Sequence, residues 1–200
     1  MIVIKMNPDD MAKVQSMLAE IKNAGSKVIS RAINKTLTGV KTDASTEIRS
    51  VITAKKSAVD GTFQITKATV TDLRGVFASS GRPLPLMDYS ARQTKKGVSV
   101  QVKKTGTRTV IAGTFISTMK SGHKGVFWRQ WHGGKRSPKK KIAYARLPKM
   151  YRMPIEERFG PRIPDYLGDK GPVMGRLLAK TDERLHKNMA SELNFELSKL

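Results

Sequence analysis

Apolar side chains recur at helical spacing through the first quarter of the chain. The first stripe has steps of three and four residues and consists of Met11, Val14, Leu18 and Ile21. Asn7 before it is a typical helix cap, and Pro8 suits the first helical position. A longer stripe with the same steps consists of Ile29, Ile33, Leu37, Val40, Ala44, Ile48 and Val51. The pattern predicts two amphipathic helices within residues 7–57, the first of them ending or bending at Gly25.

The period changes to that of strands after Asp60-Gly61. Val98, Val100 and Val102 alternate with polar residues, which is typical of a half-buried strand. Glycine-containing turns separate further predicted strands at about 69–79, 108–118, 125–131 and 142–147. Five of the nine prolines then fall within residues 148–172. We therefore expect residues 149–172 to be an irregular connector that cannot form the interior of a sheet.

Helical spacing returns at Val173. The last stripe consists of Leu177, Leu178, Thr181, Leu185, Met189, Leu193 and Leu197. Helices followed by strands and a final helix predict an α+β fold, in which long N-terminal helices and a C-terminal helix pack on a mostly antiparallel sheet. Because no repeat or boundary is evident, we expect residues 1–200 to form a single domain with four parts: a helical region (7–57), a basic β region (69–148), a Pro-rich connector (149–172) and a C-terminal helix (173–199).

The charge distribution along the chain indicates what kind of partner the protein binds. The chain has 38 Lys and Arg against 16 Asp and Glu, a net charge of +22. No carboxylate lies between Asp88 and Glu156, whereas the same stretch has 17 Lys and Arg. A field of one sign implies an anionic partner, either phosphates or an acidic protein surface. The predicted anionic-partner contacts are Arg92, Lys95, Lys96, Lys103, Lys104, Lys135, Arg136, Lys139, Lys140 and Lys141.

The aromatic residues among these cations have two interpretations. Phe127, Trp128 and Trp131 would serve as stacking surfaces in a nucleic-acid-binding protein. Along a strand over residues 125–131, however, Trp128 points to the opposite face from the other two, so at least one face is expected to belong to the core. The sequence has no zinc finger, recognition-helix motif or aromatic RNA-binding signature, and we expect no sequence-specific recognition of nucleic acid.

The sequence offers no pattern typical of catalysis or of a metal site. Cysteine is absent, which excludes disulfides and thiolate zinc sites and fits a reducing cytoplasm. The three histidines, His123, His132 and His186, are scattered. We expect no enzyme, no cofactor and no metal. The apolar run at the start is too short for a signal peptide, and no stretch approaches the about 20 apolar residues that span a bilayer, so no membrane contact is expected.

A series of short segments in the middle of the chain carries a family resemblance. The segments are Gly81-Arg82-Pro83-Leu84-Pro85-Leu86, Ala91-Arg92-Gln93-Thr94-Lys95-Lys96-Gly97-Val98-Ser99-Val100, Ile111-Ala112-Gly113-Thr114-Phe115-Ile116, Ser121-Gly122-His123-Lys124-Gly125-Val126-Phe127-Trp128-Arg129, Leu147-Pro148, Met153-Pro154-Ile155-Glu156, Phe159-Gly160-Pro161 and Ile163-Pro164. In order and spacing, over roughly residues 25–168, they resemble the minor tail protein Z (tail-completion) family of tailed bacteriophages and prophages. The loop at 132–141 is more basic, and the helical segment from 173 longer, than that family leads one to expect.

The resemblance implies a structural virion protein that completes the head-proximal end of a phage tail, the neck, for head-tail joining. The implied partners are other tail and neck proteins, namely the tail terminator and the head-tail connector, and DNA in the tail lumen would suit the basic surface. The resemblance also implies a homo-oligomeric ring, a hexamer by analogy with tail tubes, located in the virion and in the host cytoplasm during assembly. The alternative is a nucleic-acid-binding protein without sequence specificity.

Overall fold

The computed structural model describes residues 2–17, 24–129, 155–168 and 173–199 of the chain. Contacts within the chain divide it into two compact units. The helical unit comprises Met1–Val51, Lys56–Arg82 and Pro161–Leu200, and the β unit comprises Ile52–Lys55 and Pro83–Gly160. The chain passes from one unit to the other several times, so the units do not follow the regions predicted along the sequence. A single domain over 1–200 stays a prediction.

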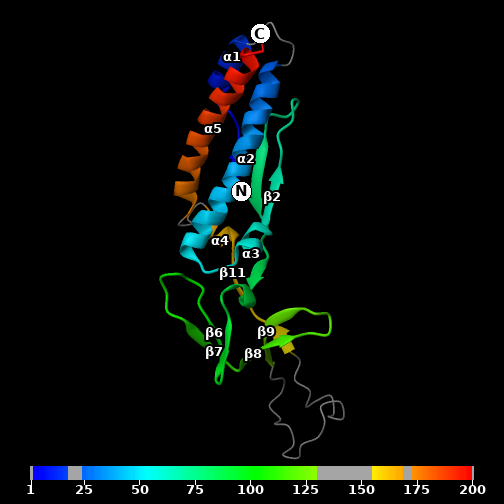
Figure 1. Ribbon diagram of the computed structural model, residues 1–200, viewed down its shortest axis with the longest axis vertical. Coiled ribbons are helices and arrows are strands. Elements are labelled where there is room, and N and C mark those ends of the chain that lie inside the picture. The colour runs from blue at the N-terminus through cyan, green and yellow to red at the C-terminus, as the bar shows by residue number, and fades with distance from the viewer. Residues whose placement is uncertain (1, 18–23, 130–154, 169–172, 200) are drawn as a thin grey trace, which may run out of the picture. The chain divides into compact units, whose positions relative to one another are not determined.

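The helical unit is built around α2 (Ala24–Val51), the long helix predicted from the second apolar stripe. Every member of that stripe from Ile29 to Ile48 is at most 1% exposed. The other helices of this unit are α1 (Pro8–Met17), α3 (Lys56–Asp60), α4 (Pro164–Leu167) and α5 (Met174–Leu197). Figure 1 shows α5 running along α2, and the contacts between these two helices are the most extensive between any two described elements.

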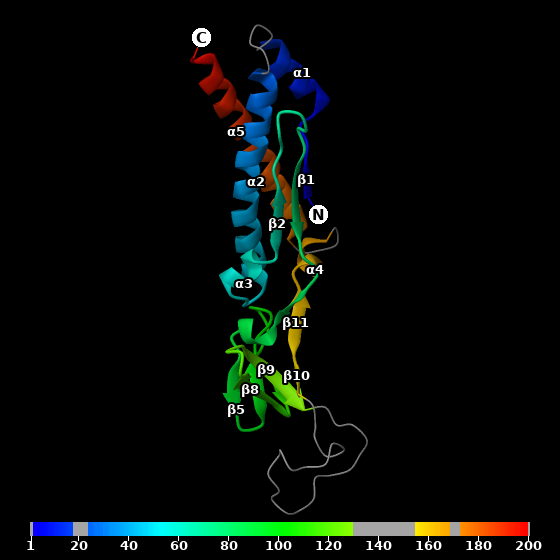
Figure 2. The same ribbon diagram turned by 90° about the vertical axis from the view of Figure 1, so that its right-hand side faces the viewer.

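A three-stranded antiparallel sheet covers another side of α2. Its strands are ordered β1 (Ile2–Ile4), β3 (Gly75–Ser79) and β2 (Phe63–Thr66). Figure 2 shows this sheet beside the long helix. Gly75 of β3 lies so close to α2 that a Cβ there would be 2.6 Å from Cγ2 of Ile33. Glycine at this position therefore lets the strand approach the buried stripe of the helix.

Short antiparallel strands form the β unit. One sheet has the order β5 (Arg92–Thr94), β6 (Gly97–Val100), β7 (Thr109–Ala112), and a second the order β10 (Ile155–Glu157), β9 (Lys124–Arg129), β8 (Thr114–Thr118). The strand pairs in both are antiparallel. A two-stranded sheet joins β4 (Pro83–Pro85) to β11 (Phe159–Arg162), and a 3₁₀ turn, η1 (Leu86–Asp88), follows β4.

The structure confirms the α+β class, the antiparallel sheets, the long N-terminal helix and the C-terminal helix. Several local predictions were wrong. Gly25 lies in the first turn of α2 and does not end a helix. The strand predicted at 108–118 is two strands, because Gly113 with φ of 73° turns the chain between β7 and β8. The strand predicted at 142–147 lies outside the described residues.

The prediction of an irregular connector at 149–172 was wrong over residues 155–167, where β10, β11 and α4 form. The two described prolines of this segment are compatible with this structure because of where they stand. Pro161 lies in a two-stranded sheet, in which both strands are edges, and Pro164 begins α4. The related expectation that this segment forms no sheet interior holds for β10, which lies at an edge of its sheet.

Candidate functional site

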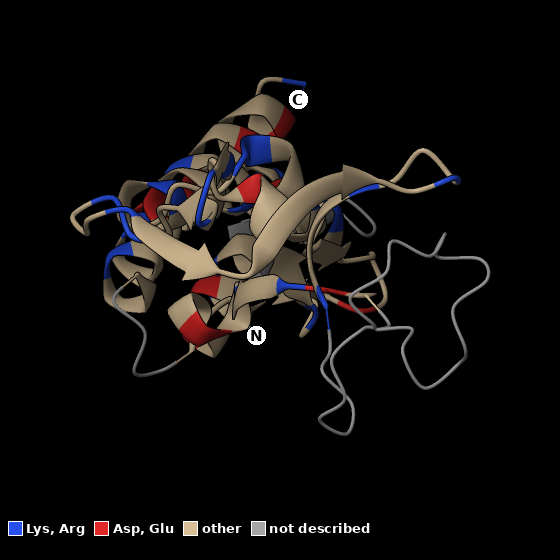
Figure 3. Cartoon of the chain, turned by 90° about the horizontal axis from the view of Figure 1, so that it is seen from below, with Lys and Arg blue, Asp and Glu red and all other residues tan. Residues whose placement is uncertain are grey.

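The two units differ sharply in their balance of charge. The helical unit has 19 Lys and Arg against 13 Asp and Glu, a net charge of +6. The β unit has 19 Lys and Arg against 3 Asp and Glu, a net charge of +16. Figure 3 shows acidic and basic segments close together along the helices. Most of the net charge predicted to meet a partner therefore belongs to the β unit.

Acidic residues of the helical unit form ion pairs with cations of the same unit where α2 contacts α5. Cations precede acids along the paired positions of both α2 and α5, so the antiparallel arrangement of the helices brings opposite charges together at steps of four residues. The pairs are Arg31–Glu196 (3.1 Å), Lys35–Glu192 (3.1 Å), Asp43–Arg184 (2.6 Å), and Glu47 with both Lys180 (2.6 Å) and Arg176 (2.8 Å). This ladder favours the antiparallel orientation and one register, and it neutralises part of the unit from within.

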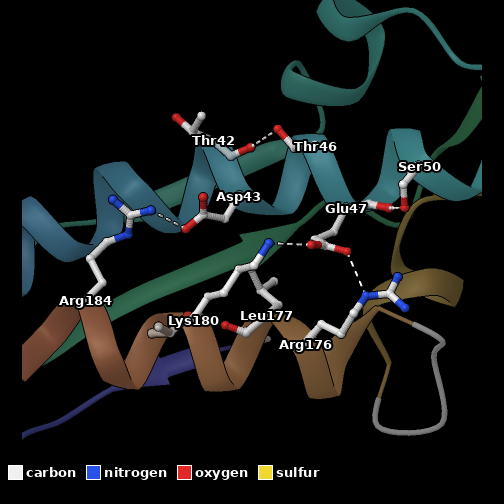
Figure 4. Close-up of polar contacts among 10 residues, drawn as sticks. Thr42, Asp43, Thr46, Glu47, Ser50, Arg176, Leu177, Lys180 and Arg184 are labelled. Carbon is white, nitrogen blue, oxygen red and sulfur yellow. Dashed lines mark hydrogen bonds and ion pairs between the residues drawn. The ribbon is translucent and has the colours of Figure 1, made fainter.

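Glu47 is the most enclosed carboxylate of the ladder, with 9% of the residue exposed. Its two oxygens accept hydrogen bonds from Lys180 Nζ and Arg176 Nε, as Figure 4 shows. The hydrogen bond from Lys180, followed by that from Arg176, lowers the pKa of the Glu47 carboxyl, although desolvation acts in the opposite direction. The charged form is therefore the one that this site stabilises.

The same ladder of ion pairs explains why position 39 of α2 is a glycine. A Cβ on Gly39 would collide with the side chain of Arg184, lying 2.6 Å from its Nε. The guanidinium of Arg184 thus passes directly over the helix backbone on its way to Asp43. The about 1 kcal/mol of helix propensity lost at glycine is offset by this close contact between the helices.

The three carboxylates of the β unit interact with side chains other than those of the predicted contact residues. Asp88 is 3.2 Å from Lys55, and Glu157 Oε1 is 2.9 Å from His123 Nε2. Trp128 Nε1 donates a hydrogen bond to Glu156 Oε2 at 3.4 Å. The Lys and Arg of residues 92–112 consequently meet no carboxylate of their own unit within the described structure.

We call β5, β6, β7 and their turns, residues 92–112, the cationic sheet. Arg92, Lys95, Lys96, Lys103 and Lys104 of the predicted contacts lie in it, and all five are exposed. None of them forms an ion pair with any residue that the structure describes. The other predicted contacts, Lys135, Arg136, Lys139, Lys140 and Lys141, lie outside the described residues.

The cationic sheet does not gather its charges at one point. Lys95 and Lys96 form the turn between β5 and β6, whereas Lys103 and Lys104 follow the far end of β6. Along an extended chain these two pairs are separated by roughly 20 Å. Arg92 pairs with Ser99 and so lies between them. The arrangement suits an extended anionic partner better than a single small anion.

Arg108 belongs to this surface and was not among the predicted contacts. Its Nε donates to Ser99 Oγ at 3.2 Å, and its Nη2 donates to the backbone oxygens of Ser99 and Ser90. These neutral acceptors hold the guanidinium in place but leave its charge uncompensated. No sequence signal marks Arg108, because the hydrogen bonds depend on the pairing of β6 with β7.

Of the three aromatic residues predicted as possible stacking surfaces, the two that the structure describes, Phe127 and Trp128, are packed rather than free for stacking. Phe127 is 6% exposed, and its ring centre is 6.3 Å from those of Phe115 and His123. The guanidinium carbon of Arg158 lies 3.9 Å from the ring centre of Trp128 and so covers a face of the indole. These contacts favour the core interpretation of Phe127 and Trp128. Trp131 lies outside the described residues.

Two further features of the described residues bear on other kinds of site. No group of three or more His, Cys, Asp or Glu in that part of the chain is placed to hold a metal ion. Among the helices described, none combines the length and apolar character needed to cross a membrane.

Comparison with known proteins found no matching family model, no similar curated protein and no similar solved structure. The resemblance to the tail-completion family therefore stays a prediction, and the charge and geometry of the cationic sheet carry the argument about function.

Proposed function

We propose that the protein is a structural, non-enzymatic component of a phage tail that completes its head-proximal end for head-tail joining. The observation that carries this proposal is the division of charge between the units. Where α2 contacts α5, the helical unit pairs acids with its own cations, whereas the β unit has a net charge of +16 and an exposed cationic sheet that meets no acid among the described residues. Such a surface needs contact with an anionic neighbour, as in a large assembly.

The neighbours in this proposal are the tail terminator and the head-tail connector, with the protein itself forming a homo-oligomeric ring. Heterologous contacts that close on rotation would bury the same surfaces on every subunit. The protein would reside in the virion after assembly in the host cytoplasm. The resemblance of residues 25–168 to the tail-completion family supports these assignments.

Deleting the gene from its phage is expected to yield tails that do not join heads, because the head-proximal end is left unfinished. Electron microscopy of lysates should show separate tails and filled heads, and expression of the wild-type chain from a plasmid should restore complete particles. A deletion lysate with the normal number of infectious, head-bearing particles would contradict the proposal.

A non-sequence-specific nucleic-acid-binding protein is the second candidate, because a row of unpaired cations also suits phosphates. The structural proposal predicts no mobility shift of a short DNA duplex at about 150 mM salt, because a surface that serves an acidic protein makes too few phosphate contacts to hold DNA at that ionic strength. The second candidate predicts a mobility shift. The double variant Lys95→Glu/Lys96→Glu should then weaken DNA binding more than about tenfold. The slope of log affinity against log salt concentration should fall by about two, one for each phosphate contact that is lost. The control is Lys56→Glu/Lys67→Glu, which makes the same charge change at exposed positions of the helical unit.

A further inference from the structure

The strand β7 forms an open edge of the cationic sheet. In the order β5, β6, β7, only one side of β7 is paired with a described strand. Its sequence, Thr109-Val110-Ile111-Ala112, is uncharged and free of proline, and Val110 is 46% exposed. Three of the four residues are β-branched, which favours the extended conformation. An edge of this kind presents unpaired backbone N–H and C=O groups to a further strand.

Other edge strands of the β unit have features that oppose such pairing. β10 has two adjacent acids, Glu156 and Glu157, and β4 has proline at both ends. β5 and β8 cover each other in part, since the backbone N–H of Ile116 donates to Gln93 Oε1 at 2.8 Å. Charges, prolines and covering contacts are the usual means by which edges avoid pairing. Of the edges described in this unit, β7 is the one without them.

The charges around β7 define the chemistry of a partner. Arg108 directly precedes the strand and is held by Ser99 and Ser90. At the other end, the N–H of Gly113 donates to the carbonyl of Lys96, which brings the Lys95–Lys96 turn next to the end of β7. Cations therefore flank both ends of an uncharged strand, and the three carboxylates of the unit are engaged elsewhere.

We propose that β7 is a docking strand, to which a neighbouring protein adds an extended segment with Asp or Glu at both ends of a short β-branched run. Backbone hydrogen bonds to β7 supply the affinity, while Arg108, Lys95 and Lys96 select the acidic flanks. Pairing with a second copy is disfavoured, because two β units of net charge +16 repel each other. The inference rests on the proposed assembly function, since it assigns a contact mode to that function.

The test uses the full wild-type chain and a fluorescent octapeptide of sequence Glu-Glu-Thr-Val-Thr-Val-Glu-Glu. Fluorescence anisotropy measures its affinity beside that of the same peptide with all four central residues N-methylated, which keeps the charge but removes the backbone donors. Strand addition predicts that methylation weakens binding about tenfold or more, as expected for the loss of two hydrogen bonds. Equal affinity of the two peptides would mean that charge attraction alone accounts for binding, and it would overturn the proposal. The absence of binding by the unmethylated peptide would overturn it as well.

Amide hydrogen exchange locates the contact. The unmethylated peptide should slow exchange within residues 109–112 about tenfold, with the amides of β10 unchanged. Protection confined to another strand would overturn the proposal. The proposal would also be overturned if residues 109–112 were protected in the absence of peptide and this protection increased with protein concentration. That result would assign the edge to a second copy of the chain. Failure of peptide binding does not alter the expected deletion phenotype, and a normal deletion phenotype does not abolish peptide binding, so the two proposals fail separately.

Discussion

Replacing Gly97 with alanine is expected to lower the free energy of unfolding of the β unit by about 3 kcal/mol, through backbone strain and lost strand pairing. Gly97 has φ of 155°, and a Cβ there would collide with the backbone oxygen of Ile111 and lie 3.1 Å from Cα of Ala112. These atoms belong to the backbone of β7 and cannot rotate away, so β6 and β7 must separate. Urea unfolding followed by tryptophan fluorescence measures the loss, because Trp128 lies in β9 of the β unit.

Gly113→Ala is the matched control. Gly113 also has a positive φ, 73°, but a Cβ there would meet no heavy atom within 4 Å. We expect a loss of about 1–2 kcal/mol from the left-handed conformation alone. Circular dichroism at 222 nm, which reports mainly the helical unit, should change little in either variant. Equal losses at Gly97 and Gly113 would show that the collision with β7 does not determine the stability of this sheet.

The long helices were predictable because their apolar stripes run over many turns. The stripe from Ile29 to Ile48 repeats often enough to exclude a strand, and it is buried as expected. β1 and β2, by contrast, have three and four residues, too few for an alternation to stand out. They form because Phe77 of β3 and the buried stripe of α2 offer them an apolar surface, which is a tertiary effect.

The partner of α2 was not predicted, although the sequence contains a signal for it. The paired positions along residues 31–47 and along residues 180–196 both run from cations to acids, so antiparallel packing brings opposite signs together. Recognising it requires comparing segments that are more than a hundred residues apart. The pair of His123 with Glu157 spans only 34 residues but was also missed, because it depends on the pairing of β10 with β9, the strand that begins directly after His123.

The candidate site was predictable in its charge but not in its shape. Counting Lys and Arg locates the surplus in the β region, since no carboxylate interrupts it. The separation of Lys95 and Lys96 from Lys103 and Lys104 follows from the length of β6, and the place of Arg108 follows from its register with β7. Register depends on which side chains are buried and on the turns, and neither is readable from the charges alone.

Glu47→Gln is expected to lower the free energy of unfolding by about 2 kcal/mol at pH 7, because glutamine loses two charge-assisted hydrogen bonds at an enclosed position. This loss is smaller than that for a fully buried pair, since the side chains of Arg176 and Lys180 are 55% and 51% exposed. The pKa of Glu47 is lowered in the folded protein, so its contribution is present above the ordinary value of 4.5 and lost as the pH falls through the folded value. The difference between wild type and variant should therefore shrink progressively below about pH 4.5. Urea unfolding followed at 222 nm measures this difference at each pH.

Glu183→Gln provides the control on α5, because Glu183 is exposed and has no described ion-pair partner. This variant should stay within about 0.5 kcal/mol of wild type throughout the same pH range. Arg176→Gln and Lys180→Gln should each cost less than Glu47→Gln, since either one leaves Glu47 with its other cation. A Glu47→Gln difference that stayed constant from pH 7 to pH 3 would mean that packing, and not the carboxylate charge, joins α2 to α5 at this point. The ladder would then have no part in setting the register of the two helices.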